Sequence, residues 1–475
     1  MRTILPVLLI FAVSSICRAQ KVASTNDTAQ LLSELIRVNT SNPPGHEGEL
    51  AELLATKFRA LGFQIDIIPA PEPGKAHFIA RLRGDGSKKP VLLAAHADVV
   101  GVERDKWTVD PFQGIVEDGY VYGRGAIDFK GGIAVFAQAV LMLAKNKIPL
   151  ARDIIFLSEA DEEGGRYNTT WLAEQHWDKI DCEFALNEGG WIMKNSDGKV
   201  RYVSISTADK SGVSLVLTAH GTSTHSSMPR PDNAIFTLSR AMTKIADYDT
   251  KPFLIPITKE FFMTMGKTST PPMSTYFDNL ANSKDPELVR TADLEISKDP
   301  LLHAIMRNTI APVLMNAGFR GNVIPGTAQA TLNFRIIPGT HPGDLIQEMK
   351  RVINDPRVDV TFATTATGGT RPLAVIERMS KTQPSSQDTE LYQSLARQAK
   401  TIYPEAAVTP YLFQAGTDSF AWRSRNVPVY GIYPYPIDAD DLARMHGNDE
   451  RVSVESLRTG TEMIYHTLVE VAGRK

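Results

Sequence analysis

Apolar positions along the chain follow helical spacing in some stretches and strand-like spacing in others. Leucines at helical spacing predict two short helices at 27–38 and 47–60, with the turn Asn42-Pro43-Pro44-Gly45 between them. We also expect strands at 63–68, 78–82, 91–95, 153–157 and 184–186, and a helix at 132–145. This alternation of strands and helices predicts an α/β domain with a sheet that is at least partly parallel.

The pattern changes near Gly212. We expect strands at 213–217, 327–336 and 358–362, and helices at 233–248 and 342–354. This order is typical of a small βαββαβ domain inserted into the first domain. The stretch 250–311 within it is rich in Pro, Phe and Met, shows no regular spacing and is expected to be irregular.

The first pattern returns after Pro372, with a helix at 391–402, a strand at 427–432 and a closing helix at 454–471. We therefore expect the first domain in two pieces, 20–210 and 364–475, around an insert at 211–363. Two domains also suit a length of 475 residues, which exceeds what one hydrophobic core usually organises. The net charge of -3 shows no basic excess, so nucleic acid is not an expected partner.

The first residues have the features of a secretory signal peptide at 1–19. Arg2 gives a positive start, residues 4–13 are apolar, and Cys17-Arg18-Ala19 supplies small residues at a cleavage site. The apolar run is too short to span a bilayer. We expect a secreted or periplasmic protein with no membrane attachment after cleavage. Cys182 would then be the one remaining cysteine, which excludes an internal disulfide.

Polar residues follow the expected strands. His96 and Asp98 come directly after the strand 91–95, and both side chains point the same way because strand side chains alternate. A metal-binding imidazole could be held there by its carboxylate neighbour. The alternative is a polar pair at a strand end.

Asp128 lies in a glycine-dense stretch, residues 123–132, just before a helix. The glycines allow close backbone approach. Phosphate binding is the rival function, but the spacing matches neither the dinucleotide fingerprint nor the P-loop. A plain helix cap is the structural alternative.

Further carboxylates follow the later strands, with Glu162 and Glu163 after 153–157, and Glu188 after 184–186. His446 adds an imidazole near the C-terminus. Gathering Asp128, Glu163 and Glu188 in one partly dry cleft requires compensating positive charge. Two divalent cations would supply it. Nitrogen and oxygen ligands without thiolate fit zinc, cobalt or manganese, and the order of affinities favours zinc.

At this point the sequence resembles the M20 metallopeptidases. The motifs that carry the resemblance are His96-Ala97-Asp98-Val99-Val100, residues 107–132, Asp161-Glu162-Glu163-Gly164, Asn187-Glu188-Gly189-Gly190 and His446-Gly447. It implies a zinc-exopeptidase type catalytic domain, with a mixed, mostly parallel sheet flanked by helices, and an inserted ferredoxin-like lid or dimerisation domain.

The resemblance also implies roles for individual residues. His96 and Glu188 would bind one metal ion, Glu163 and His446 the other, Asp128 both, with Glu162 as general base and Asp98 orienting His96. Phe129 follows the bridging ligand, and the family has a peptide bond of unusual geometry there, with cis as one option.

The same resemblance assigns residues to the substrate. His225 would help to polarise the substrate carbonyl, and in dimeric relatives this histidine crosses to the partner's site; His220 is the alternative. Asn322, Arg335, Gly416 and Thr417 fall where relatives bind the substrate's terminal carboxylate. For all of these, an ordinary structural role is the alternative.

These residues predict a secreted di-metal hydrolase that cleaves the amide bond next to a free carboxylate in small peptides. An N-acyl amino acid amidohydrolase is the alternative substrate class, and a homodimer through the lid is the expected assembly if one forms. Phe253, Phe261, Phe262 and Met265 either line a pocket for a bulky group or belong to the lid core. A non-catalytic binding protein on a hydrolase fold is the different-class alternative, and it predicts a missing ligand or base.

Overall fold

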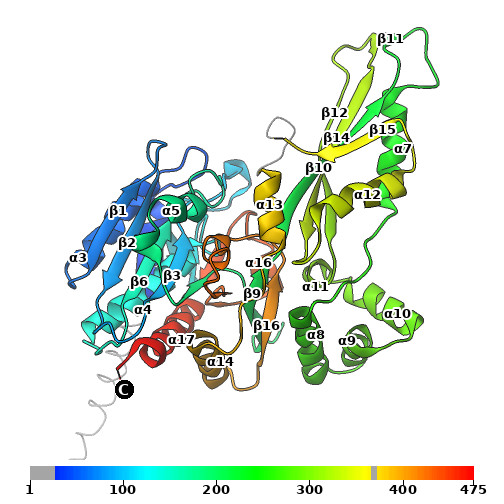
Figure 1. The fold of residues 1–475 in the computed structure, drawn as a ribbon. Helices are drawn as coiled ribbons and strands as arrows, with labels where there is room; N and C mark the ends of the chain where they lie inside the picture. Colours follow the sequence, from blue (N-terminus) through cyan, green and yellow to red (C-terminus); the bar gives the residue numbers. More distant parts are fainter. Residues whose placement is uncertain (1–26, 365–371, 475) are drawn as a thin grey trace, which may run out of the picture. The chain divides into compact units, whose positions relative to one another are not determined.

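The computed structural model describes residues 27–364 and 372–474 (Figure 1). The signal peptide predicted at 1–19 lies outside these residues. The described chain divides into two compact units. Unit 1 contains residues 27–203, 390–406 and 433–474, and unit 2 contains 204–364, 372–389 and 407–432.

Unit 1 is built on a mixed sheet. Five of its strands lie in the order β1 (Gln64–Pro69), β2 (Ala76–Leu82), β6 (Ile154–Glu159), β3 (Val91–His96) and β7 (Phe184–Asn187). The three strands β6, β3 and β7 are parallel, and β1 and β2 are antiparallel to their neighbours. Every residue of β3 and β6 is buried, so both faces of the sheet are covered at these strands.

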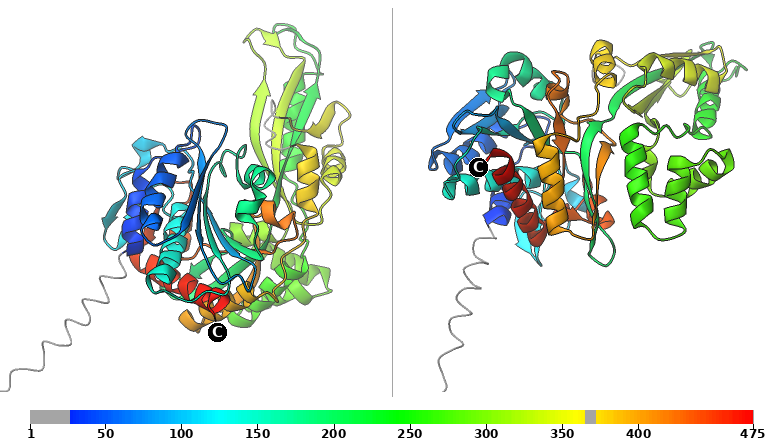
Figure 2. Two further views of the ribbon diagram at one scale, coloured as in Figure 1. Left: turned by 60° about the vertical axis from the view of Figure 1, so that its left-hand side comes forward. Right: turned by 60° about the horizontal axis from the view of Figure 1, so that its bottom comes forward.

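Helices cover this sheet. The helical segments of unit 1 are α2 (Asp27–Arg37), α3 (Glu47–Arg59), η1 (Arg104–Lys106), α4 (Lys130–Lys145), α5 (Thr169–Gln175), α6 (Trp177–Ile180), α14 (Glu390–Ile402), α16 (Ala439–Leu442) and α17 (Val454–Ala472). The C-terminal helix α17, dark red in Figure 2, packs against α4 and α14. The predicted mixed α/β fold is therefore confirmed.

Short strands complete unit 1. A separate sheet has the order β19 (Arg451–Ser453), β5 (Tyr120–Tyr122) and β4 (Ile115–Glu117). In addition, β8 (Ile192–Lys194) pairs with β18 (Pro436–Ile437) and with the first half of β9 (Val200–Asp209). The second half of β9 belongs to unit 2.

Unit 2 contains a four-stranded antiparallel sheet in the order β12 (Thr309–Ala317), β14 (Thr327–Ile336), β10 (Ser211–His220) and β15 (Val358–Phe362). The helices α7 (Ala234–Ala246) and α12 (Pro342–Ile353) lie beside it (Figure 1). Along the chain the order is β10, α7, β12, β14, α12, β15, which is the predicted βαββαβ arrangement. Unit 2 also contains β11 (Thr224–His225), β13 (Val323–Ile324), α13 (Leu373–Ser380), β16 (Ala407–Phe413), α15 (Phe420–Arg423) and β17 (Val429–Gly431), as well as helices within residues 250–311.

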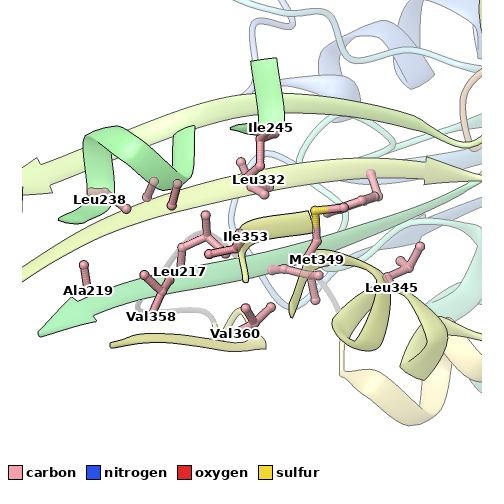
Figure 3. Close-up of a cluster of buried hydrophobic side chains, with 14 of the residues drawn as sticks. Leu217, Ala219, Leu238, Ile245, Leu332, Leu345, Met349, Ile353, Val358 and Val360 are labelled. Atoms are coloured by element: carbon pink, nitrogen blue, oxygen red, sulfur yellow. The ribbon is translucent and has the colours of Figure 1, made fainter. Parts of the chain in front are cut away.

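The core of this part of unit 2 forms between one face of the sheet and the two helices (Figure 3). Leu217 and Leu332 from neighbouring strands pack with Leu238 of α7 and Met349 of α12, and all four are fully buried. The apolar positions alternate along β10 because one face of the sheet is buried against helices.

The stretch 250–311 was expected to be irregular, and this expectation is wrong. It contains the helices α8 (Pro256–Thr268), α9 (Met273–Asn282), α10 (Pro286–Ile296) and α11 (Pro300–Ile305). Three of them begin with proline, which is favoured in the first helical turn. Phe261, Phe262 and Met265 are fully buried among these helices, so they belong to the core of unit 2, whereas Phe253 is 53% exposed.

Candidate metal centre

The carboxyl ends of the parallel strands of unit 1 carry the predicted ligands. His96 is the last residue of β3, Glu163 follows the end of β6, and Glu188 follows the end of β7. Because parallel strands end at the same edge of a sheet, these three segments of the chain meet there. Asp128 lies just before α4, and His446 lies in the segment between α16 and β19.

Asp128 lies between the two histidines. Its Oδ1 is 3.1 Å from His96 Nε2, and its Oδ2 is 3.0 Å from His446 Nε2. His446 Nε2 is also 3.0 Å from Glu163 Oε1, and His96 Nε2 is 3.6 Å from Glu188 Oε2. The structure thus brings all five predicted ligands together. Each carboxylate oxygen of Asp128 faces a different imidazole, which is the arrangement of a bridging ligand.

The donor atoms fit metal binding. Single ligand atoms of His96, Asp128 and Glu163 all lie within 4.8 Å of one another. Nitrogen and carboxylate oxygen are the donors that zinc and related divalent cations accept. The second ring nitrogen of His96, Nδ1, contacts the main-chain carbonyl of Asp98 at 2.9 Å, which leaves Nε2 as the nitrogen available to a cation.

The charges in the centre perturb one another's pKa values. Burial raises the pKa of Glu188 to about 7, against the opposing effect of His96. The pKa of Asp128 is lowered: burial opposes this, but contacts with His446 and His96 favour its charged form. Asp128 and Glu163 in turn raise the pKa of His446 to about 10. Although burial opposes it, contacts with Asp128 and Glu188 likewise raise the pKa of His96 well above its ordinary value. Both imidazoles thus lie where the surrounding carboxylates favour positive charge.

Asp98 contacts His96 mainly through its main chain, and its carboxylate has a different set of partners. Asp98 Oδ1 accepts a hydrogen bond from the main-chain N–H of Glu162 at 3.0 Å, and Oδ2 accepts one from Glu163 N–H at 2.9 Å. The carboxylate is fully buried. Asp98 therefore ties the turn that carries Glu162 and Glu163 to the strand end that carries His96.

Asp161 lies in the same turn, and contacts of its side chain hold the turn in place. It has a left-handed backbone, with φ at 66°. Its carboxylate accepts hydrogen bonds from Lys75 Nζ at 2.6 Å, Asn42 Nδ2 at 2.8 Å, Tyr167 N at 2.6 Å and Arg166 N at 3.0 Å. Asn42 Nδ2 also donates to Asp98 Oδ2 at 2.8 Å. The turn is thus held in one conformation before any substrate arrives.

Tyr433 is a residue of the centre that the sequence analysis missed. Its hydroxyl lies 2.9 Å from Glu188 Oε2 and 3.1 Å from Asp128 Oδ1, and its ring stacks on Trp191 with the centroids 4.3 Å apart. Burial raises its pKa well above the ordinary value, so it remains a hydrogen-bond donor. The one signal in the sequence was its position directly after the predicted strand 427–432.

The predicted peptide bond of unusual geometry is present, because the bond between Asp128 and Phe129 is cis.

The predicted substrate residues lie in unit 2 and form two groups. His225 on β11 and Asn322 are neighbours, because Ser226 N–H donates to the Asn322 carbonyl at 3.0 Å and β11 pairs with β13. His225 is exposed. The alternative residue, His220, contacts Asp359 at 2.8 Å. Arg335, near the end of β14, lies opposite Gly212 at the start of β10. The end of β10 that leads to His225 lies opposite the start of β14. Arg335 is therefore at the far end of this strand pair from His225.

Gly416 and Thr417 line a pocket of unit 2 together with Lys210 and Arg423. Asp209 joins this group, because its Oδ2 accepts hydrogen bonds from Thr417 Oγ1 at 2.7 Å and from Arg423 Nη1 at 2.5 Å. Burial lowers the pKa of Lys210 to about 7. Lys210 Nζ donates to the main-chain carbonyls of Ala304 and Arg307 at 2.8 and 2.7 Å, so both basic side chains of this pocket have partners within unit 2.

An α/β sheet whose strand ends gather two imidazoles and three carboxylates is typical of metal-dependent hydrolases. The chain belongs to peptidase family M20/M25/M40, whose family model matches residues 92–470. It is therefore a hydrolase of this family, whose members act on amide bonds. The different-class alternative, a non-catalytic binding protein, predicted a missing ligand or base, but the chain carries a histidine, aspartate or glutamate at each predicted position.

Individual relatives support the family. The chain is 32% identical to a probable carboxypeptidase S-like protein of Dictyostelium discoideum, over 81% of this chain and 72% of that one. It is 28% identical to the human N-fatty-acyl-amino acid synthase/hydrolase PM20D1, over 83% and 76%. Among solved structures, an M20 family metallo-carboxypeptidase from Sulfolobus solfataricus has the same fold, with a TM-score of 0.66, 17% identity and coverage of 94% and 99%.

Proposed function

We propose that the protein is a two-metal hydrolase that cleaves the amide bond next to a free carboxylate in small peptides, as a carboxypeptidase or dipeptidase does. The observation that carries this proposal is the position of Asp128, whose two oxygens face two different imidazoles. The carboxypeptidase S-like relative supports the substrate class.

The residues of unit 1 divide between two cations. His96 and Glu188 would hold one, Glu163 and His446 the other, and Asp128 both. Zinc fits this donor set best, with cobalt or manganese as substitutes. When bound, the two cations would lower the pKa of a water molecule and offset negative charge on the attacked carbonyl group.

Glu162 would be the general base. Its carboxylate would take a proton from the attacking water and deliver it to the nitrogen of the leaving amine. The hydrogen bond from its main-chain N–H to Asp98 fixes the backbone from which this side chain extends.

The residues of unit 2 would bind the substrate. Arg335 and the Gly416-Thr417 turn supply donors for the terminal carboxylate, and His225 and Asn322 supply donors for the carbonyl region. Because the two groups lie apart within unit 2, we propose that His225 and Asn322 bind the substrate in the active site of a partner copy. On this basis we also propose that residues 211–363 form the lid.

N-acyl amino acids are the second candidate substrate class. The observation in their favour is the 28% identity to a human N-fatty-acyl-amino acid synthase/hydrolase. A matched panel separates the classes: dipeptides, the same dipeptides with amidated C-termini, and fatty-acyl derivatives of the same C-terminal amino acid. We expect dipeptides to have a kcat/KM at least about 10-fold above the acyl derivatives, and amidation to cost about 100-fold because a charged partner is lost. A higher kcat/KM for acyl derivatives would assign the second class.

We also propose a homodimer formed through unit 2. Its edge strand β12 pairs with β14 only, and Val313, Leu314 and Met315 on it are more than half exposed. An exposed apolar edge strand is a ready surface for strand pairing between copies. Sedimentation is expected to show a dimer for the natural protein and a monomer for Leu314→Glu. Leu294→Glu, at an equally exposed position on α10, is the control and should remain dimeric.

Secretion is proposed from the sequence features of residues 1–19. Within residues 27–364 and 372–474, the helices are too short or too polar to cross a bilayer. N-terminal sequencing of the exported protein should give a start close to Gln20, and a start at Met1 would contradict the proposal.

A further inference from the structure

Glu450 is a fully buried carboxylate that the proposed mechanism does not use. Its Oε1 accepts hydrogen bonds from the main-chain N–H groups of Ile127 at 2.7 Å and Asp128 at 3.0 Å. Its Oε2 accepts from Gly125 N–H at 3.1 Å and from Arg124 Nη1 at 2.7 Å. One side chain therefore holds the main chain of the glycine-dense loop that ends at Asp128.

Arg124 connects this carboxylate to a second segment. Its guanidinium is 2% exposed and donates through Nη2 to the main-chain carbonyl of Gly447 at 2.7 Å. Gly447 follows His446, whose backbone is left-handed, with φ at 59°. Residues other than glycine adopt this conformation uncommonly. The Arg124 guanidinium contacts the residue directly after this position.

The fold places the two loops together. Strand β5 ends at Tyr122, directly before the loop of Asp128, and strand β19 begins at Arg451, directly after Glu450. These strands are antiparallel neighbours, with Tyr122 opposite Arg451. The main-chain carbonyl of Glu450 extends the pairing by accepting from Gly123 N–H at 2.9 Å.

We propose that Glu450 and Arg124 are positioning residues that clamp the loop of Asp128 to the loop of His446 and so set the distance between these two ligands. The inference rests on the proposed function. Asp128 and His446 would share the cation that Glu163 also binds. Loss of the clamp should therefore lower the affinity for that cation more than the affinity for the cation held by His96 and Glu188.

The test uses the mature full-length protein, stripped of metal with a chelator and titrated with Co²⁺ in competition with a chromophoric chelator. We expect Glu450→Gln and Arg124→Lys to bind one Co²⁺ with natural affinity and the second about 10- to 100-fold more weakly. The absorption spectrum of the more weakly bound Co²⁺ ion should change shape. In hydrolysis, kcat should fall by a similar factor with KM within about 3-fold, and excess Co²⁺ should restore most of the loss.

Arg152→Lys is the matched control. Arg152 is 1% exposed and forms two ion pairs at 2.7 Å, with Glu183 and Glu390, but it lies before the start of β6, at the end away from the metal centre. It should lower the unfolding temperature without changing either Co²⁺ affinity. If Glu450→Gln does not fold, Arg124→Lys, which keeps the charge, decides the question alone.

Natural affinity for both Co²⁺ ions in Arg124→Lys, with unchanged kcat, would overturn the inference and leave the proposed function intact. Failure of the unaltered protein to bind two Co²⁺ ions would instead overturn the proposed function and the inference with it.

Discussion

Glu162→Ala is expected to lower kcat for peptide hydrolysis by about 1,000- to 10,000-fold while both metal ions stay bound. General acid-base catalysis by a positioned side chain contributes about this much. The affinity for metal should stay because Glu163, not Glu162, faces His446, and because the Asp98 contacts go to the main chain of the turn. The measurement is kcat at saturating substrate, together with the metal content of the same sample.

Two further variants sharpen this test. Glu162→Asp keeps a carboxylate on a shorter side chain and should recover part of the activity, with the pH optimum near that of the natural enzyme. Glu174→Ala, on α5, removes a glutamate outside the centre and should leave kcat unchanged. A Glu162→Ala protein with natural kcat would show that another group moves the proton.

Asp128→Asn is expected to reduce the bound metal from two ions to one or none and to lower kcat at least about 1,000-fold. The amide has one oxygen and no charge, so it cannot bridge two cations or offset their repulsion. The main-chain N–H of Asp128 donates to Glu450 Oε1 at 3.0 Å, and its Oδ1 accepts a hydrogen bond from the Tyr433 hydroxyl at 3.1 Å, so contacts hold both its backbone and its side chain. Metal content after dialysis, measured per chain, is the direct observable.

The control for this variant is Asp153→Asn. Asp153 is also a buried carboxylate, and it pairs with Arg81 and Arg83 beside the start of β6, away from the centre. It should retain two metal ions and full kcat. An Asp128→Asn protein that still holds two ions with natural affinity would contradict the bridging assignment.

Much of the centre could be predicted from sequence because its ligands follow a positional rule. His96 ends strand β3, Glu163 lies in the turn after β6, and Glu188 directly follows β7, and parallel strands bring such positions to one edge. Strand β10 of unit 2 was predictable for a related reason, since one of its faces is buried and its apolar residues alternate.

The helices within 250–311 were missed because the apolar residues of the stretch show no regular spacing. Pro286 and Pro300 each follow an aspartate that caps the helix, which is a helix-start signal that was not used in the prediction. Strand β12 was missed because most of its residues are exposed on both faces, so its sequence shows no alternation of apolar and polar positions.

Tyr433 and Glu450 could not be assigned from sequence, because their roles depend on contacts across the fold. The atoms that contact the Asp128 loop come from residues more than 300 positions away along the chain. For Asp98, only part of the role could be predicted from sequence. Its place beside His96 was clear, but the bonds from its carboxylate to Glu162 and Glu163 follow from how the turn after β6 folds back.

Crystals of the protein equilibrated with Zn²⁺ and measured at wavelengths above and below the zinc absorption edge test the central claim most directly. Two anomalous peaks per chain are expected, one beside each oxygen of Asp128, with His96 and Glu188 at the first and Glu163 and His446 at the second. A single peak, or zinc bound away from Asp128, would contradict a centre in which one carboxylate bridges two cations.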